Sequence, residues 1–192
     1  TTGIGEILYK GISSNNITEN DLILVSRDIG AHGATIFAAR EGMDLETSLK
    51  SDCASLYPQV KALIDSGVKI TALRDATRGG VSAVLNEWAK QSNICIEIDE
   101  EKIPVCDEVK GICEILGFDA MSLANEGTFV LAIKKEDAQK ALEVLQTFKE
   151  AKTASIIGKV TQQYEQRVIL NSQWGTKRFL DVPTGELLPR IC

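Results

Sequence analysis

The spacing of apolar residues along the chain predicts five helices. Apolar side chains three and four residues apart mark helices over 56–64, 81–89, 109–116 and 138–145, each with one apolar face. Gly67 and Gly117 follow two of these segments, at a position typical of a helix end. A shorter helix is expected to follow Gly33.

Between the predicted helices lie apolar runs of strand length, at 21–26, 68–73, 94–98, 128–133, 155–160, 167–171 and 177–181. In 94–98 the isoleucines alternate with Cys95 and Glu97, which predicts one buried face. The last two runs flank NSQWG, a sequence typical of a hairpin turn. Strands that alternate with helices and close on a hairpin predict an α/β (α+β) layered domain, in which helices cover a mixed β-sheet.

Neither end of the chain has a periodic apolar pattern. Residues 1–12 begin as a strand would and continue into a glycine turn, whereas 182–192 form an extended tail with two prolines. The steps from Asp181 to Cys192 span up to about 36 Å at roughly 3.3 Å per residue. We therefore expect a core domain at 13–181 and a flexible tail that carries the terminal thiol of Cys192 away from its root.

Composition narrows the classes of function. Of the 192 residues 44% are hydrophobic and 25% charged, which suffices for a core and argues against global disorder. The aromatic content of 5% and the net charge of −6 argue against nucleic-acid binding, which needs stacking side chains and a basic face. No apolar run approaches the roughly 20 residues of a membrane span, and TTGIGEILYKG lacks the features of a signal peptide. These features predict a soluble, cytoplasmic protein without a nucleic-acid or membrane partner.

The five cysteines, at positions 53, 95, 106, 113 and 192, are expected to be free thiols. Their odd number argues against a disulfide framework, and with one histidine in the chain no standard zinc site is predicted, so no residue is assigned as a metal ligand. Cys53, Cys95 and Cys113 lie in apolar patterns and are predicted to be small core residues.

The sequence RDATRGG, at 74–80, joins a predicted strand to a predicted helix. Gly79 and Gly80 free backbone N–H groups beside a helix start, where an anion is favoured, and Arg78 adds a charge that suits a phosphate. Asp75 is a candidate metal ligand or turn cap. The alternative is a glycine turn with an Asp–Arg pair on the surface, because the loop matches neither of the common phosphate-binding motifs.

Two further loops have the same character. SRDIGAHGAT, at 26–35, follows a strand and places His32 beside Gly33, where it contacts phosphate or substrate or serves as a structural hydrogen bonder. LANEGT, at 123–128, presents Asn125 and Glu126 just before a strand, and a glutamate there suits a general base or a metal ligand. The alternative is a simple Asn/Glu turn. In an α/β sheet the two glycine-rich loops can converge on one edge.

The chain ends in PRIC, which places a thiol at the last position. A terminal cysteine on a mobile tail suits a covalent carrier, because nothing beyond it blocks its entry into a pocket. Arg190 can guide this thiol or favour its thiolate form. The alternative is that Cys192 has no chemical role.

Together these motifs resemble the C-terminal part of the HypE family of hydrogenase maturation factors, which are carbamoyl dehydratases. The matching stretches, in chain order, are GAHGAT, SDCA, LRDATRGGV, ICEILGFDA, ANEG and PRIC. This family belongs to a superfamily with aminoimidazole ribonucleotide synthetase and selenophosphate synthetase, so the resemblance implies a fold like the C-terminal domain of PurM.

The resemblance also implies a reaction. In that family the transferase HypF loads a carbamoyl group onto the terminal thiol, here Cys192. ATP-dependent dehydration then gives an S-thiocyanate, whose cyanide passes to iron on the HypC–HypD scaffold for [NiFe]-hydrogenase. Cys192 and Glu126 are implied as catalytic residues. The residues implied to bind ATP are Asp75, Thr77, Arg78, Gly79, Gly80, His32, Gly33 and Asn125.

One departure from the family pattern limits what this chain is expected to do. Family members carry an N-terminal ATP-binding domain, and here TTGIG matches only its last strand, so 1–12 are interpreted as a remnant of that domain. Most of the Mg²⁺ and ATP contacts and the homodimer interface are expected in the missing half, and this chain alone is expected to be inactive. The alternatives are a carrier or docking module that presents Cys192 to partners, and a phosphotransferase such as selenophosphate synthetase, which would leave PRIC without a role.

Overall fold

The computed structural model describes residues 4–7, 9–42 and 48–182, and its centre is a seven-stranded mixed sheet. The strands lie in the order β2-β4-β1-β5-β3-β6-β7, and every neighbouring pair is antiparallel except β3 and β6. Their bounds are β1 Leu22–Val25, β2 Ile70–Asp75, β3 Cys95–Asp99, β4 Phe129–Ile133, β5 Ser155–Thr161, β6 Arg167–Asn171 and β7 Lys177–Phe179. The predicted strands and the α/β layered fold with a mixed sheet are confirmed, and β7 ends two residues earlier than predicted.

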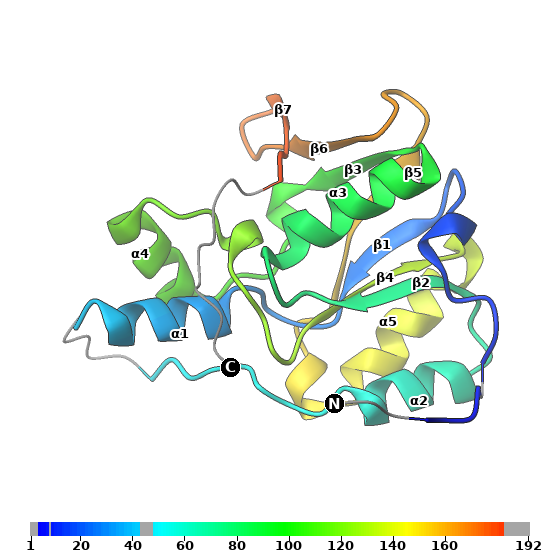
Figure 1. Ribbon diagram of the computed structural model, residues 1–192, viewed down its shortest axis with the longest axis horizontal. Coiled ribbons are helices and arrows are strands. Elements are labelled where there is room, and N and C mark those ends of the chain that lie inside the picture. Colours follow the sequence, from blue (N-terminus) through cyan, green and yellow to red (C-terminus); the bar gives the residue numbers. More distant parts are fainter. Residues whose placement is uncertain (1–3, 8, 43–47, 183–192) are drawn as a thin grey trace.

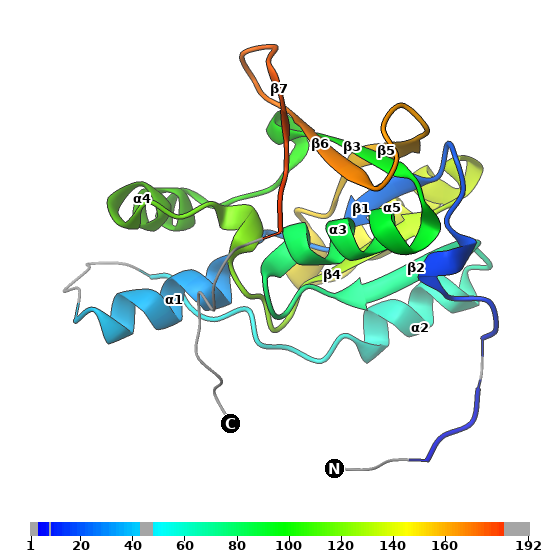
Figure 2. The same ribbon diagram turned by 45° about the horizontal axis from the view of Figure 1, so that its top comes forward.

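Five α-helices surround the sheet. They are α1 Ala31–Arg40, α2 Tyr57–Asp65, α3 Gly80–Ser92, α4 Asp107–Leu116 and α5 Ala138–Gln146. Helix α3 covers one face of the sheet, α2 and α5 cover the other, and α1 packs with α4 beside the sheet (Figures 1 and 2). No helix among the described residues is long and apolar enough to span a membrane.

The central strands are buried on both faces, which explains their uninterrupted apolar runs. Along β1, Ile23 and Val25 face the cluster beneath α3, whereas Leu24 faces the cluster beneath α2 and α5. Strand β4 alternates in the same way, with Val130 on the α3 side and Leu131 on the other. A third cluster joins α1 and α4. The sheet is therefore a rigid base for the loops at its edges.

Two local predictions are corrected by the structure. Helix α1 starts at Ala31 and runs for ten residues, so Gly33 lies inside the helix rather than ahead of it. The reason is that Gly30, with φ of 85°, takes the left-handed conformation that starts the helix. The strand expected at 68–73 runs instead over Ile70–Asp75, so Arg74 and Asp75 lie in β2, paired with Val130 and Phe129, and not in the loop that follows.

The chain termini add little regular structure within the described residues. Residues 4–7 and 9–13 carry no helix or strand, although the Ser13 N–H donates to the Thr71 carbonyl at the edge of β2. At the other end β6 and β7 form the predicted hairpin, and Gly175 has φ of 78° in its turn. The predicted tail, with Cys192, lies outside the described residues except for Val182.

Candidate functional site

Three loops that the sequence marks as candidates meet at one end of the strands, which we call the sheet edge. Strands β1 and β2 both run antiparallel to β4, so the carboxyl ends of β1 and β2 lie beside the amino end of β4. The register pairs Val25 with Val130 and Asp75 with Phe129 at this edge. The convergence of the two glycine-rich loops, expected from the strand-loop-helix pattern, is confirmed (Figure 1).

Asn125 joins these three loops. The side chain is fully buried, and its Oδ1 accepts a hydrogen bond from the Gly30 N–H at 2.7 Å. Its Nδ2 donates to the carbonyls of Ala76 and Leu123, each at 3.0 Å. Both ends of the amide are therefore engaged by backbone groups, which makes Asn125 a positioning residue. Its direct contact with a nucleotide stays a prediction.

Asp52 fixes the loop that carries Glu126, and sequence reasoning assigned it no role. Its side chain is 4% exposed and accepts hydrogen bonds from the N–H groups of Glu126 and Gly127, both at 3.0 Å, and from the Thr128 hydroxyl at 2.8 Å. A carboxylate that accepts three hydrogen bonds in the interior is strongly held and holds its donors in turn. The sequence feature that could have pointed to Asp52 is its place in SDCA, at 51–54, one of the stretches that match the family.

Glycines permit close contact between the loops. At Gly127 an added Cβ would lie 1.8 Å from the carbonyl oxygen of Asp52. At Gly80, where φ is 61°, it would lie 2.5 Å from the carbonyl oxygens of Met121 and Leu123. Gly33 packs in the same way on Leu123 and donates its N–H to the Ala124 carbonyl at 2.9 Å. Gly33 and Gly80 thus bring α1 and α3 against the loop that leads to β4.

The charged side chains of the site lie outside this buried frame. Asp75, Arg78 and Glu126 are exposed, and none has a side-chain hydrogen bond or ion pair within the described part of the chain. Arg74 pairs instead with Glu87 on α3, so Asp75 and Arg78 do not form the surface pair of the alternative interpretation. Three charged groups are thus free to meet a ligand.

His32 and Thr77 are half-buried. His32 Nδ1 lies 2.9 Å from the Ser51 hydroxyl oxygen, so this histidine has the structural contact that was one of its two interpretations. The Thr77 carbonyl accepts a hydrogen bond from the Gly80 N–H at 3.2 Å, which closes the turn into α3. Both residues lie in the loops that converge at the sheet edge.

The helix starts at this edge suit an anion. Gly30 and Gly79 occupy the positions just before α1 and α3 in the left-handed conformation, and neither supplies a side-chain cap. Neither helix has an acidic residue in its first turn. The N–H groups of Gly33 and Gly80 are already bonded to the carbonyls of Ala124 and Thr77. The remaining first-turn N–H groups and the helix dipoles favour negative charge, and Arg78 reinforces this preference. The residues present therefore fit the phosphates of a nucleotide.

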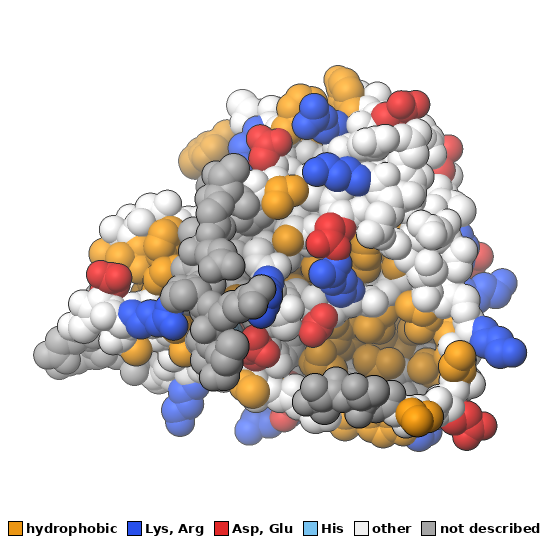
Figure 3. All heavy atoms as spheres, in the orientation of Figure 1, with side chains coloured by type: hydrophobic (Ala, Val, Ile, Leu, Met, Phe, Trp, Pro, Cys, Tyr) orange, Lys and Arg blue, Asp and Glu red, His pale blue; other side chains and the backbone are white. Residues whose placement is uncertain are grey.

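A metal site is a different matter. The described residues contain no group of three or more His, Cys, Asp or Glu side chains placed to hold a metal ion. On the face shown in Figure 3, acidic and basic side chains are interspersed and form no broad region of one charge. The two exposed carboxylates of the site, Asp75 and Glu126, thus belong to no such group.

The cysteines differ in exposure and in acidity. Cys95 and Cys113 are buried as predicted, but Cys53 is exposed, which corrects its assignment to the core. Cys53 lies in an extended segment without helix or strand, where its neighbour Asp52 turns inward. Burial, aided by Asp119, raises the pKa of the Cys113 thiol to about 11, and burial also raises the pKa of Cys106.

This difference predicts an order of thiol labelling. The labelling reagent iodoacetamide reacts with the thiolate form of cysteine. Because the pKa of Cys113 is raised, only about one Cys113 side chain in a thousand is a thiolate at pH 8. At pH 8 we expect Cys53 to be alkylated first and Cys113 to react about tenfold faster for each pH unit up to its pKa. Peptide mass spectrometry of timed samples measures both rates, and equal labelling of Cys53 and Cys113 at pH 8 would contradict the assignment.

Comparison with known proteins shows that the chain belongs to the AIR synthase related family and is similar to hydrogenase maturation proteins. Residues 18–171 match the family model of the AIR synthase related protein, C-terminal domain. The whole chain is 44% identical to the carbamoyl dehydratase HypE of Escherichia coli strain K12 and covers 56% of that protein. The chain thus spans a little over half the length of this curated relative, and the sequence resemblance to the C-terminal part of HypE proteins is confirmed.

Two crystal structures match the fold closely. A hydrogenase maturation protein HypE in complex with ATP is 35% identical, with a TM-score of 0.92 over 98% of this chain and 58% of that one. HypE in a HypE–HypF complex is 41% identical, with a TM-score of 0.86 over 92% of this chain and 58% of that one. The fold of this chain is therefore the fold of the matching part of these two structures.

Proposed function

Because the chain belongs to the AIR synthase related family through its C-terminal domain, we propose that it forms the C-terminal part of a cytoplasmic carbamoyl dehydratase of the HypE type. In the complete protein, a carboxamide on the Cys192 sulfur loses water to become an S-thiocyanate, the cyanide donor for the iron of [NiFe]-hydrogenase. The observation that carries the proposal is the meeting of the Arg78 loop and the Glu126 loop at one sheet edge, fixed by Asn125.

The free charged groups match the needs of this dehydration. An amide oxygen is a poor leaving group, and ATP supplies the phosphoryl group that makes it a good one. Arg78 and the N–H groups at the start of α3 would bind phosphate oxygens and offset their charge. The amide nitrogen would lose one proton as its oxygen is phosphorylated and the other as the C–O bond breaks and phosphate leaves. Glu126 would accept the second proton, so that the carbon–nitrogen bond becomes a triple bond while carbon stays on the Cys192 sulfur.

The buried frame explains how an exposed glutamate can act as a positioned base. The Asp52 carboxylate accepts hydrogen bonds from the N–H groups of Glu126 and Gly127. The side chain of Asn125, the residue before Glu126, donates to the Ala76 carbonyl in the Arg78 loop. The carboxylate of Glu126 is therefore fixed at its root but remains accessible. Proximity of a phosphate-binding loop and a base lowers the entropic cost of bringing both to one substrate.

The second half of the nucleotide site would come from residues that precede this chain in its relatives. Asp75, the last residue of β2, is the one exposed carboxylate of 74–80, so most Mg²⁺ ligands would lie in that preceding half. We expect the 192-residue chain alone to show little ATP binding and no dehydration. Isothermal titration with ATP and Mg²⁺ measures this, and micromolar binding by the isolated chain would contradict it.

The partners of the proposed enzyme follow the same reasoning. HypF would load the carbamoyl group on Cys192, a step supported by the crystal structure of a HypE–HypF complex. The HypC–HypD scaffold would receive the cyanide, and the complete protein would be a homodimer through its preceding half. The alternative is a carrier module that presents Cys192 to partners without catalysis of its own. In that case the carboxamide on Cys192 would persist when ATP is present, whereas the proposed enzyme would dehydrate it.

Glu126→Gln tests the assignment of the base. In the complete protein, glutamine keeps the size and the exposed position of the side chain but cannot accept the proton, so we expect dehydration to fall at least about a hundredfold. Carbamoyl loading by HypF should be unchanged, because loading needs the thiol and not the base. The mass of the Cys192 peptide reports both steps. A dehydration rate equal to that of the unsubstituted protein would remove Glu126 from the mechanism.

A further inference from the structure

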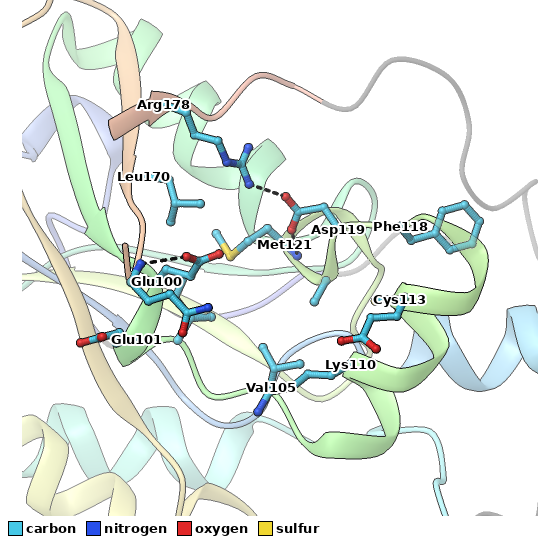
Figure 4. Close-up of a pocket in the computed structure, with 14 residues that line it drawn as sticks. Glu100, Glu101, Val105, Lys110, Cys113, Phe118, Asp119, Met121, Leu170 and Arg178 are labelled. Carbon is cyan, nitrogen blue, oxygen red and sulfur yellow. Dashed lines mark hydrogen bonds and ion pairs between the residues drawn. The ribbon is translucent and has the colours of Figure 1, made fainter. Parts of the chain in front are cut away.

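A pocket on the surface is not lined by the three loops, and the proposed dehydration does not use it. It has a volume of about 680 Å³ and lies between α4, the short helices η2 (Glu100–Lys102) and η3 (Ala120–Ser122), and the β6–β7 hairpin (Figure 4). Its floor is apolar and includes Val105, Met121 and Leu170. We name it the α4 pocket.

The rim of the α4 pocket carries excess negative charge. Asp119 is paired with Arg178 at 2.8 Å, and Lys110 is paired with Asp107 at 3.1 Å. Glu101 and Glu114 also line the pocket, and neither has a hydrogen bond or ion pair within the described residues. Glu100 lines the pocket too and accepts a hydrogen bond from the Gln173 N–H. The apolar floor suits an apolar segment, and the two unpaired carboxylates suit a cationic side chain within it.

The chain itself ends in such a segment. LLPRIC, at 187–192, contains Leu187, Leu188 and Ile191 together with one cationic side chain, Arg190, which the terminal carboxylate of Cys192 balances in charge. From these complementary features we propose that the α4 pocket binds the 187–192 segment of the same chain. The significance of this contact rests on the proposed function, because docking would hold Cys192 away from the three loops until a partner or the loaded group displaces the tail.

The geometry of the described residues brings this segment within reach. Leu180 is fixed: it is 3% exposed, its N–H donates to the Val168 carbonyl, and its carbonyl accepts from Asn86. It lies only two residues after Arg178, which lines the pocket. Seven residues from Leu180 to Leu187 span up to about 23 Å at roughly 3.3 Å per residue, enough to turn back to the pocket.

Attachment to the domain makes a weak interaction sufficient. A short connection, such as the residues between Leu180 and Leu187, gives a tethered segment an effective concentration in the millimolar range. A peptide that would bind the pocket with a millimolar dissociation constant is then docked for about half of the time. Docking is therefore reversible, as a tail that visits several partners requires.

Disulfide trapping tests the proposal without ATP or any partner. A cysteine is introduced by Glu114→Cys, on the pocket side of α4, or by Glu108→Cys, on the same helix but outside the pocket lining. Cys113 itself lines the pocket and is removed with the other two thiols. In a Cys53→Ser, Cys106→Ser, Cys113→Ala background, a glutathione buffer should link Cys192 to position 114 within one chain at least about tenfold faster than to position 108. The matched position controls for the reach of the tail.

A third variant separates docking from random collision. Leu187→Asp with Leu188→Asp should slow the link to position 114 to the rate seen at position 108, because the apolar contact is lost. Equal rates at 114 and 108, an unchanged rate in the leucine variant, or a link formed between two chains would each overturn the proposal. The trapping is independent of dehydration, so failure of the proposed function would leave this result standing.

Discussion

Replacing Asp52 with alanine is expected to lower the melting temperature of the domain by about 10 °C. The substitution leaves two backbone N–H groups and the Thr128 hydroxyl without their buried acceptor. An unpaired buried donor costs about 1–3 kcal/mol, and we expect a total near 4 kcal/mol as water replaces part of the loss. In a domain of this size each kcal/mol corresponds to about 2–4 °C.

The control for Asp52→Ala is Asp107→Ala. Asp107 carries the same group, but its side chain is 97% exposed and paired only with Lys110 on the surface. Such a pair contributes about 0–1 kcal/mol, so its loss should shift the melting temperature by about 4 °C or less. Thermal unfolding followed by circular dichroism measures both variants. Equal shifts would mean that Asp52 does not fix the Glu126 loop.

Gly127→Ala is expected to destabilise the chain by about 3 kcal/mol or more. The added methyl group would lie 1.8 Å from the Asp52 carbonyl oxygen, so the two segments must separate by more than 1 Å. The separation strains the packing and lengthens the hydrogen bond from the Gly127 N–H to Asp52 at the same time. The position of Glu126 shifts with it, so dehydration by the complete protein should fall as well.

Gly111→Ala provides the matched control. Gly111 lies inside α4, and an added Cβ there has no atom within 4 Å. Alanine in a helix interior is more favourable than glycine by about 0.5–1 kcal/mol, so this variant should be more stable than the unsubstituted chain. Urea unfolding measures both free energies of unfolding. A Gly127→Ala variant as stable as the unsubstituted chain would show that the two segments are not in close contact.

The helices and strands could be predicted because each leaves a periodic pattern of apolar residues within its own short segment of sequence. Val81, Val84 and Leu85 mark one face of α3, and the structure buries all three. The order of the strands was not predicted, because the pairing of β3 with β6 joins segments about 70 residues apart. Nothing in the apolar spacing of either strand encodes its neighbour.

The candidate loops were predicted, but the residues that hold them were not. Asp52 resembles a surface acid in the sequence, because the groups it binds lie 74–76 residues further along the chain. Asn125 was singled out as a ligand contact, which stays a prediction, but its use of the amide to bond backbone groups of three loops was not foreseen. Cys53 was assigned to the core because extended segments lack the periodicity that distinguishes an inward from an outward side chain.

The most direct test of the account is the mass of the Cys192 peptide in the complete protein. After HypF and carbamoyl phosphate have loaded the thiol, the peptide is measured before and after addition of ATP and Mg²⁺. The account predicts that the carboxamide peptide becomes lighter by one water when ATP is present and stays unchanged without it. A carboxamide that persists with ATP, in protein shown to be folded and loaded, would contradict the proposed dehydration.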